Sequence, residues 1–396
     1  MKYCIVVPDG MADYPITRLG DRTPLEAART PSMDRIAAEG VVGMARLVPP
    51  KMEPSSDVAN LSLLGYAPRQ HYTGRGPLEA ASMGIELAGG DVAFRCNLIT
   101  VDDEDRIEDY SAGEISSKEA ALLIDAVAKE FAGYDVTFHA GISFRHIMIY
   151  GGAEEMTPTC FAPHDHMGEN FAKYLPKGPG GKLLNEMILA SRAILEQHEI
   201  NKVRIDLGEN PANMIWPWSP GGMPKLELFH DRWGLEGAVI CAVDLIKGIA
   251  LLTGLDFIEV PGATGSYDTA YAAKGEYAAK ALEDHDFVFV HVESPDTAGH
   301  AADVAEKIRA IEEIDKQIVG PLHEALRESG DYRILVLPDH PTPIAKRTHV
   351  ADPVPFALCG AGIASDDDLP FAESSVAHAT LRFKEGHHLI GYMLGT

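Results

Sequence analysis

Three short apolar runs in this chain are each followed closely by an aspartate, and this pattern constrains the fold more than any other. The runs cover residues 4–8, 287–292 and 334–338, and the aspartates are Asp9, Asp296 and Asp339. Near-continuous runs of Val, Ile and Leu are typical of buried strands in a parallel sheet. Because an open α/β sheet forms its site where such strands end, we expect the three carboxylates to gather at one edge of a sheet.

Histidines accompany two of these aspartates at spacings that suit metal ligands. His300 follows Asp296 by four residues, so on a helical turn both side chains lie on one face. His340 follows Asp339 directly, and His349 lies nine residues beyond it in a proline-bounded loop. Mixed Asp and His sets suit Mn²⁺ or Zn²⁺. Two ions about 3.5–4 Å apart can clamp both oxygens of a phosphoryl displacement, so the pattern predicts a dinuclear metal centre.

Taken one at a time, these signals also have structural readings. Asp9 could cap the next helix, and Asp296 with His300 could form a surface pair. Their joint occurrence after three strand-like runs favours the metal centre.

A candidate nucleophile lies at the start of the predicted short helix over residues 56–64. Ser55 and Ser56 are ordinary N-cap residues by type. The helix N-terminus that a cap creates also favours anions and would stabilise a serine alkoxide or a phosphate. A serine activated by a metal ion is therefore a candidate nucleophile.

Composition excludes several classes of function. The net charge of −25 argues against a nucleic-acid or anionic-membrane surface, although local arginines can still hold an anionic substrate. No stretch approaches the roughly 18 apolar residues of a membrane span, and no signal peptide precedes the first strand-like run. The five cysteines are scattered without a C-x-x-C pair. We expect a soluble cytoplasmic protein, and the sequence leaves its oligomeric state open.

The order of the signals predicts two domains, one of them discontinuous. Metal-type residues come from both ends of the chain, whereas the middle is rich in Gly, Pro and arginine. We expect a core domain from residues 1–65 and 236–396, with a second domain, residues 66–235, inserted between them. In the core domain, we expect helices over 239–252 and 302–326 and a strand over 257–260.

Two arginines of the middle segment stand out from the solvated surface. Arg75 lies in the glycine-flanked turn 73–76, and Arg95 lies in the apolar run 94–97. Bidentate guanidinium contacts are the expected way to hold a carboxylate and a phosphate.

Several segments of the chain resemble those of known protein families. Residues 30–40 (TPSMDRIAAEG) are similar to an early helix of the alkaline phosphatase superfamily, and the whole chain resembles the archaeal-type cofactor-independent phosphoglycerate mutases. The latter resemblance rests on the two metal motifs and on residues 8–13 (PDGMAD), 56–66 (SDVANLSLLGY), 72–80 (YTGRGPLEA), 93–98 (AFRCNL) and 261–265 (PGATG).

The resemblance implies a fold and a ligand set. The fold is α/β, with an alkaline-phosphatase-like three-layer α/β/α core and a smaller inserted α+β domain for substrate binding and transfer. Ser56 matches the nucleophile that becomes phosphorylated. One metal would be held by Asp9, Ser56, Asp339 and His340, and the other by Asp296, His300 and His349.

The resemblance also implies a reaction. The chain would interconvert 3-phosphoglycerate and 2-phosphoglycerate, in glycolysis and gluconeogenesis, through a phosphoserine and without 2,3-bisphosphoglycerate. Mn²⁺ is the favoured ion, with Mg²⁺, Co²⁺ or Zn²⁺ as alternatives. The residues at motif positions suited to substrate contacts are Arg75, Arg95, Arg145, His164 and Lys247.

The chain departs from the family pattern at three places, and other classes of function share parts of it. Ser55 stands where a glycine commonly precedes the nucleophile, so it competes with Ser56; residues 216–222 differ from the usual run, and Val350 replaces a common threonine. A phosphatase with the same metal core, a homoserine kinase-like phosphotransferase and a non-catalytic metal-binding protein are the alternatives.

Overall fold

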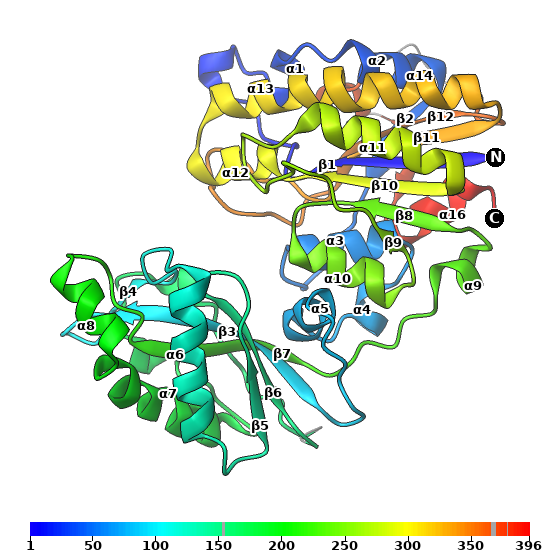
Figure 1. The fold of residues 1–396 in the computed structure, drawn as a ribbon. Coiled ribbons are helices and arrows are strands. Elements are labelled where there is room, and N and C mark those ends of the chain that lie inside the picture. The colour runs from blue at the N-terminus through cyan, green and yellow to red at the C-terminus, as the bar shows by residue number, and fades with distance from the viewer. Residues whose placement is uncertain (153–154, 366–369, 378) are drawn as a thin grey trace. The chain divides into compact units, whose positions relative to one another are not determined.

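A computed structural model describes residues 1–152, 155–365, 370–377 and 379–396 (Figure 1). The chain forms two compact units. Unit 1 comprises Met1–Tyr72 and Leu226–Thr396, and unit 2 comprises Thr73–Lys225.

Unit 1 extends further along the chain than the expected core domain, because segments near both boundaries pack within it. Arg232 donates from Nη2 to the Gly65 carbonyl at 2.8 Å, and Tyr66 donates from its hydroxyl to the Glu227 carbonyl at 2.8 Å. The insertion therefore begins after residue 72, not 65, and ends at 225, not 235.

Unit 1 is built on an eight-stranded sheet in the order β13-β2-β12-β11-β1-β10-β8-β9. Its strands are β1 (Lys2–Pro8), β2 (Val41–Ala45), β8 (Gly237–Ile240), β9 (Asp256–Phe257), β10 (Phe287–Val292), β11 (Tyr332–Val336), β12 (Val354–Gly360) and β13 (Arg382–Phe383). The strands β11, β1, β10, β8 and β9 run parallel, whereas β12 is antiparallel to both of its neighbours. The central strands are almost wholly buried, as their apolar sequences predict.

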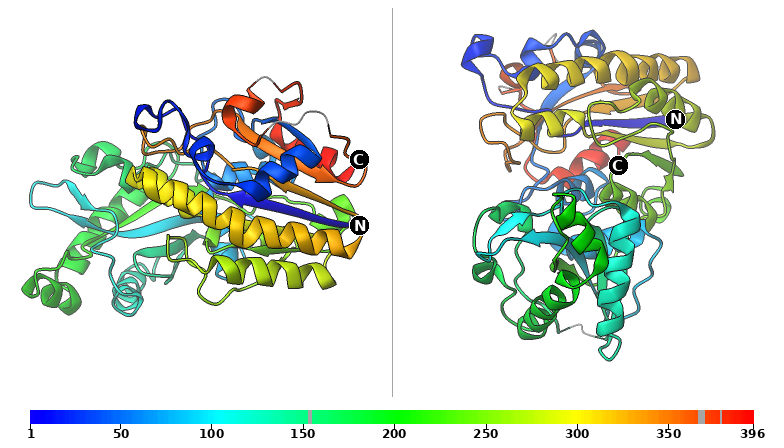
Figure 2. Two further views of the ribbon diagram at one scale, coloured as in Figure 1. Left: turned by 90° about the horizontal axis from the view of Figure 1, so that it is seen from above. Right: turned by 60° about the vertical axis from the view of Figure 1, so that its left-hand side comes forward.

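Helices cover both faces of this sheet, which gives a three-layer α/β/α arrangement. The helices of unit 1 are α1 (Pro24–Ala27), α2 (Pro31–Glu39), α3 (Ser56–Leu63), α4 (Pro68–His71), α9 (Phe229–Trp233), α10 (Asp244–Leu252), α11 (Tyr271–Asp284), α12 (Ser294–Ala301), α13 (Val304–Ile314), α14 (Gly320–Ser329), α15 (Glu373–Val376) and α16 (Leu389–Leu394). Figures 1 and 2 show α2, α11, α13 and α14 on one face and α3, α10 and α16 on the other.

Local sequence explains several of these elements, and three expectations need correction. Thr23 and Glu26 form a capping box at the start of α1. The expected helix over 239–252 is shorter, because its first residues complete strand β8 beside β10. The expected strand over 257–260 is only Asp256–Phe257. The expected helix over 302–326 contains a π-helical segment, Asp315–Val319, just before Pro321, which lacks the N–H that an α-helical bond would need.

Unit 2 is an α+β unit with a five-stranded antiparallel sheet. Its elements are α5 (Arg75–Ser82), β3 (Val92–Val101), β4 (Ile107–Asp109), α6 (Ser117–Glu130), β5 (Val136–His139), β6 (Arg145–Tyr150), α7 (Gly181–Glu196), α8 (Glu199–Asp206) and β7 (Met214–Gly221). The long strand β3 pairs with β4, β6 and β7, and side chains of α6 and α7 pack into one core cluster with it.

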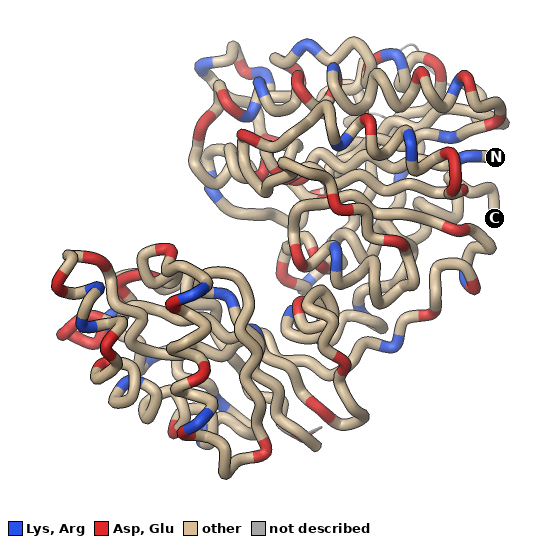
Figure 3. The backbone as a smooth tube through the Cα atoms, in the orientation of Figure 1, with Lys and Arg blue, Asp and Glu red and all other residues tan. Residues whose placement is uncertain are grey.

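Two global properties agree with the composition. Asp and Glu are distributed along the backbone of both units (Figure 3). Among the residues described, no helix combines the length and apolar character needed to cross a bilayer.

Candidate metal centre

The parallel order of three strands brings the predicted ligands together at one edge of the unit 1 sheet. Strand β1 lies between β11 and β10, with Pro8 opposite Val292 and Val6 opposite Val336. Asp9 directly follows β1, Asp339 lies in the loop after β11, and α12 begins two residues after β10. All of these segments therefore meet beyond the carboxyl ends of parallel strands.

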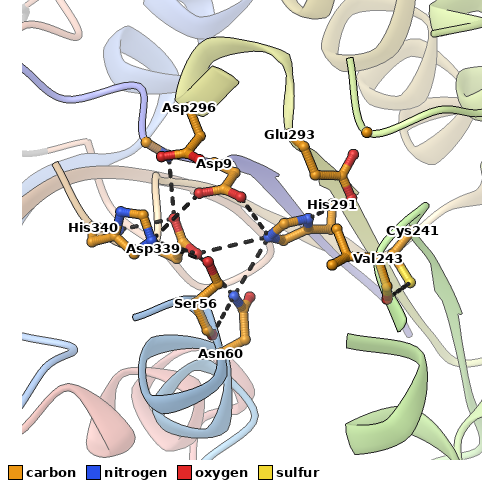
Figure 4. Close-up of polar contacts among 12 residues, drawn as sticks. Asp9, Ser56, Asn60, Cys241, Val243, His291, Glu293, Asp296, Asp339 and His340 are labelled. Atoms are coloured by element: carbon orange, nitrogen blue, oxygen red, sulfur yellow. Dashed lines mark hydrogen bonds and ion pairs between the residues drawn. The ribbon is translucent and has the colours of Figure 1, made fainter. Parts of the chain in front are cut away.

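The first ligand group consists of Asp9, Ser56, Asp339 and His340 (Figure 4). The Nε2 atom of His340 lies 3.6 Å from Asp9 Oδ1 and 3.6 Å from Asp339 Oδ2. The Ser56 hydroxyl lies 3.1 Å from the same nitrogen. Asp9, Asp339 and His340 are buried, so their facing atoms are shielded from water.

The second ligand group consists of Asp296 and His300, both on α12, and His349 from the loop before β12. His300 Nε2 lies 3.3 Å from Asp296 Oδ2, and His349 Nε2 lies 3.3 Å from Asp296 Oδ1. The two Nε2 atoms are 2.9 Å apart.

The second ligand group has too few protons for each of its facing nitrogen and oxygen atoms to take part in a hydrogen bond within the group. His300 Nδ1 faces the Arg347 carbonyl at 3.0 Å, and His349 Nδ1 faces the Pro54 carbonyl at 3.2 Å. Carbonyl oxygens only accept, so both Nδ1 atoms carry protons. The two Nε2 atoms face each other, so at most one of them can also carry a proton. The lone pair of the other Nε2 atom and the Asp296 carboxylate then face the same small space. A divalent cation fits this arrangement.

The first group fits a cation for a related reason. Among the residues that the structure describes, Asp9 Oδ1 is buried and has no hydrogen-bond partner, although His340 Nε2 lies 3.6 Å away (Figure 4). An orphaned carboxylate oxygen in a dry site is costly, and coordination of a metal would satisfy it. Carboxylate, hydroxyl and imidazole donors together are a set that Mn²⁺ or Zn²⁺ accepts.

The pKa shifts of the ligand side chains follow from their burial and from their close neighbours. Burial, followed by repulsion from Asp339 and Asp296, raises the pKa of Asp9 well above its usual range. Burial opposes ionisation of Asp296 too, but its close contacts with His300 and His349 hold its pKa well below the usual range. Burial lowers the pKa of His340 to about 4, so this imidazole is neutral and carries a lone pair at neutral pH.

Sequence reasoning missed His291, which lies behind the first ligand group on β10. Its Nε2 is 3.6 Å from Asp9 Oδ2 and 3.7 Å from Asp339 Oδ2, and its Nδ1 is 3.1 Å from Glu293 Oε1. Glu293 in turn accepts from the fully buried Lys274 at 3.2 Å. A buried row of charged groups thus supports the ligand carboxylates. A histidine and a glutamate that end an apolar strand were the available signal.

The structure distinguishes the two candidate serines. Ser55 is the N-cap residue of α3, without a side-chain capping bond, and Ser56 is the first residue of the helix. Only for Ser56 among these two is a contact with a ligand side chain present in the described structure. Asn60, one turn later, donates to the Ser56 carbonyl at 2.8 Å and to Asp339 Oδ2 at 2.9 Å, which fixes the helix start against the ligand group.

Unit 2 gathers four of the predicted substrate residues around aromatic side chains. Arg75 and Arg95 lie with their guanidinium carbons 5.6 and 5.5 Å from the centre of the Trp218 ring. His164 packs edge-on against the same ring at 5.4 Å. Arg145 joins this group indirectly. The Tyr110 ring packs against both His164 and Phe144, and the Arg145 guanidinium lies over the Phe144 ring.

Strand register explains this gathering. Arg95 on β3 is paired with Trp218 on β7, and Asn97 on β3 is paired with Arg145 on β6. Trp218 donates from Nε1 to Asn97 Oδ1 at 3.0 Å, so its ring is held in place. The tryptophan lies in residues 216–222, which depart from the family pattern, and its central position could not be read from the sequence.

The fifth predicted substrate residue, Lys247, lies on α10 in unit 1. Its ammonium group is 5.0 Å from the centre of the Phe257 ring, and it belongs to neither ligand group. Its contact with substrate therefore stays a prediction, as do those of the four residues in unit 2.

Comparison with known proteins agrees with the geometry. Residues 37–201 match the family described as 2,3-bisphosphoglycerate-independent phosphoglycerate mutase. A protein of that name from Methanosarcina mazei is 50% identical over 100% of this chain and 100% of its own length. One of the two numbered forms from Methanothermobacter thermautotrophicus is 50% identical over 100% of this chain and 97% of its own length.

Solved structures extend the likeness to the fold. A protein from Pyrococcus horikoshii has a TM-score of 0.84 and 30% identity, over 100% of this chain and 96% of its own. A cofactor-independent phosphoglycerate mutase from Thermoplasma acidophilum has a TM-score of 0.66 and 28% identity, over 100% of this chain and 99% of its own. The chain belongs to the family of 2,3-bisphosphoglycerate-independent phosphoglycerate mutases.

Proposed function

We propose that this protein interconverts 3-phosphoglycerate and 2-phosphoglycerate through a phosphoserine at Ser56, without 2,3-bisphosphoglycerate. The observation that carries the proposal is the Ser56 hydroxyl, 3.1 Å from His340 Nε2 inside a buried set of carboxylates and imidazoles. The names of the relatives supply the substrate.

Two divalent cations are part of the proposal, with Mn²⁺ the favoured ion. Asp9, Ser56, Asp339 and His340 would hold one, and the second ligand group would hold the other. Bound there, the ions would supply positive charge that lowers the pKa of the serine hydroxyl and neutralises the phosphate. The orphaned Asp9 Oδ1 and the facing Nε2 atoms of the second group support this assignment.

The chain's own residues set up two balanced transfers. In the first transfer, Ser56 Oγ forms a bond to phosphorus as the bond between phosphorus and the C3 oxygen of 3-phosphoglycerate breaks. The serine hydroxyl loses one proton, and the C3 oxygen of the departing glycerate gains one. In the second transfer the C2 hydroxyl of glycerate attacks the phosphoserine, and Ser56 recovers its proton. No phosphate is gained or lost overall. The α3 N-terminus, held by Asn60, contributes oriented N–H groups that favour the anionic phosphate.

The arginines of unit 2 would bind the anionic groups of the substrate. Arg95 is buried, and together with Arg75 it contacts Glu79. Fixed guanidinium groups of this kind bind carboxylates and phosphates through paired hydrogen bonds. Positioning and charge neutralisation would then provide most of the rate acceleration.

The test is an assay of metal-free protein reloaded with Mn²⁺ and given 3-phosphoglycerate, without 2,3-bisphosphoglycerate. Both 2-phosphoglycerate and inorganic phosphate are followed. We expect isomerisation with little release of phosphate. Release of phosphate without 2-phosphoglycerate would identify a phosphatase, and ATP-dependent phosphorylation of homoserine without isomerisation would identify a kinase; either result refutes the proposal.

A further inference from the structure

Thr342 lies between the two ligand groups, in the loop after β11, and is completely buried. Neither the apolar runs nor the metal motifs draw attention to it. Its hydroxyl oxygen nevertheless contacts one predicted ligand of each group: Asp296 Oδ1, to which it donates, and His340 Nδ1 at 3.3 Å.

The directions of these two hydrogen bonds follow from the groups involved. A carboxylate oxygen only accepts, so the Thr342 hydroxyl proton is given to Asp296. The hydroxyl oxygen is then free to accept, and the Nδ1–H of His340 is the donor that faces it. This assigns the proton of the neutral imidazole to Nδ1 and the lone pair to Nε2, the atom that faces Ser56 and the first group.

The backbone of Thr342 is fixed independently of the hydroxyl. Its carbonyl accepts from Lys307 Nζ at 2.9 Å, and its N–H donates to the Ala12 carbonyl at 3.3 Å. Lys307 is fully buried and also pairs with Asp13 at 2.8 Å. The loop that carries Thr342 is therefore anchored to the segment after β1.

Two glycines make room for the side chain. A Cβ atom at Gly10 would lie 2.6 Å from Thr342 Oγ1, and one at Gly299 would lie 2.5 Å from the Thr342 carbonyl oxygen. Gly10 has a φ of 64°, which also favours glycine. Gly10 thus leaves room for the Thr342 hydroxyl, and Gly299 leaves room for the rest of the residue.

We propose that Thr342 is a positioning residue that couples the two ion sites, by fixing the tautomer of His340 and the orientation of Asp296 through one hydroxyl group. The proposal rests on the proposed dinuclear centre. Groups that orient metal ligands from behind typically change metal affinity by about 10–100-fold when removed. Because one hydroxyl serves both groups, its loss is expected to weaken both sites.

The experiment compares Thr342→Val, which keeps the shape and removes the hydroxyl, with Thr342→Ser, which keeps the hydroxyl. Metal-free proteins are titrated with Mn²⁺ by calorimetry in the absence of substrate. We expect Thr342→Val to weaken binding at both sites by about 10–100-fold, and Thr342→Ser to retain most of the affinity. Thr253→Val is the matched control: Thr253 is buried, and its hydroxyl donates to the Ile249 and Ala250 carbonyls, which belong to neither ligand group. It is expected to bind Mn²⁺ like the wild type.

Several results would overturn the proposal. Thr342→Val binding both ions as the wild type does, or Thr342→Ser binding as weakly as Thr342→Val, removes the role of the hydroxyl. If Thr342→Val does not fold, nitrogen-15 NMR of the metal-free wild type decides: a proton on Nδ1 of His340 supports the proposal, and one on Nε2 contradicts it. A wild type that binds no Mn²⁺ refutes the metal centre itself, which separates the two failures.

Discussion

Replacing Asp9 by asparagine is predicted to stabilise the metal-free protein while weakening its response to metal. Asp9 is buried close to Asp339 and Asp296, and this burial and repulsion raise its pKa well above the usual range. The ligand atoms of Asp9 and Asp339 lie within 4.8 Å of one another. At an effective dielectric constant of about 20, two charges at that distance repel by about 3 kcal/mol.

Attraction offsets part of this repulsion. His291 Nε2 lies 3.6 Å from Asp9 Oδ2 and favours the charged carboxylate. The net gain expected from Asp9→Asn in metal-free protein at pH 8 is therefore about 1–2 kcal/mol. With metal the order should reverse, because an ion at 100 times its dissociation constant adds about 2.7 kcal/mol to a protein that binds it. The variant loses a ligand of the first site, so Mn²⁺ should add less to its free energy of unfolding.

Urea unfolding of wild type and variant, once with EDTA and once with saturating Mn²⁺, measures both effects. A matched control is Asp315→Asn: Asp315 is also buried, but it accepts from the Ser32 and Met33 N–H groups and belongs to neither ligand group. Whatever its effect on stability, this substitution should change the free energy of unfolding by the same amount with EDTA and with Mn²⁺. The reasoning is refuted if Asp9→Asn is less stable than the wild type in EDTA, or if Mn²⁺ stabilises both proteins equally.

Three further predictions concern the surroundings of the site. Lys307→Met should lower the free energy of unfolding by about 3–5 kcal/mol in urea titrations, because it leaves the Asp13 carboxylate buried without its cation; a loss below about 1 kcal/mol would contradict this. Burial raises the pKa of Glu373 to about 7 from the ordinary 4.5, so the folded chain holds this proton longer and stability falls as pH rises between these values. In urea titrations at pH 8, Glu373→Gln should therefore have a free energy of unfolding up to about 3 kcal/mol above that of the wild type, whereas at pH 4 the two proteins should be equally stable. Equal stability at pH 8 would refute this prediction. Arg95→Lys, which cannot reproduce the fork that contacts Glu79, should raise KM for 3-phosphoglycerate about tenfold in steady-state assays, and an unchanged KM would remove Arg95 from substrate binding.

The strand ends could be predicted because their physical basis is local. Buried parallel strands need continuous apolar residues, and their carboxyl ends must meet, so the sequence alone is enough to single out Asp9 and Asp339. The helical spacing of Asp296 and His300 likewise needs no tertiary information. The assignment of these residues to two ion sites, and of Ser56 as nucleophile, came from family resemblance.

The supporting residues could not be predicted, because their roles depend on contacts between distant segments. Thr342 has ordinary sequence surroundings, and only the fold places its hydroxyl between His340 and Asp296. Trp218 is central to unit 2 because of the register between β3 and β7, which sequence pattern does not fix. The interruption of the 302–326 helix and the shorter insertion were also set by packing.

The central claim is that Ser56 carries the phosphate between the two halves of the reaction. The most direct measurement is to mix Mn²⁺-loaded protein with 3-phosphoglycerate labelled with ³²P, quench in acid within milliseconds, and map the labelled peptide by mass spectrometry. The account predicts label on Ser56, none on Ser55, and none in Ser56→Ala. Label on Ser55, or label that persists in Ser56→Ala, would contradict it.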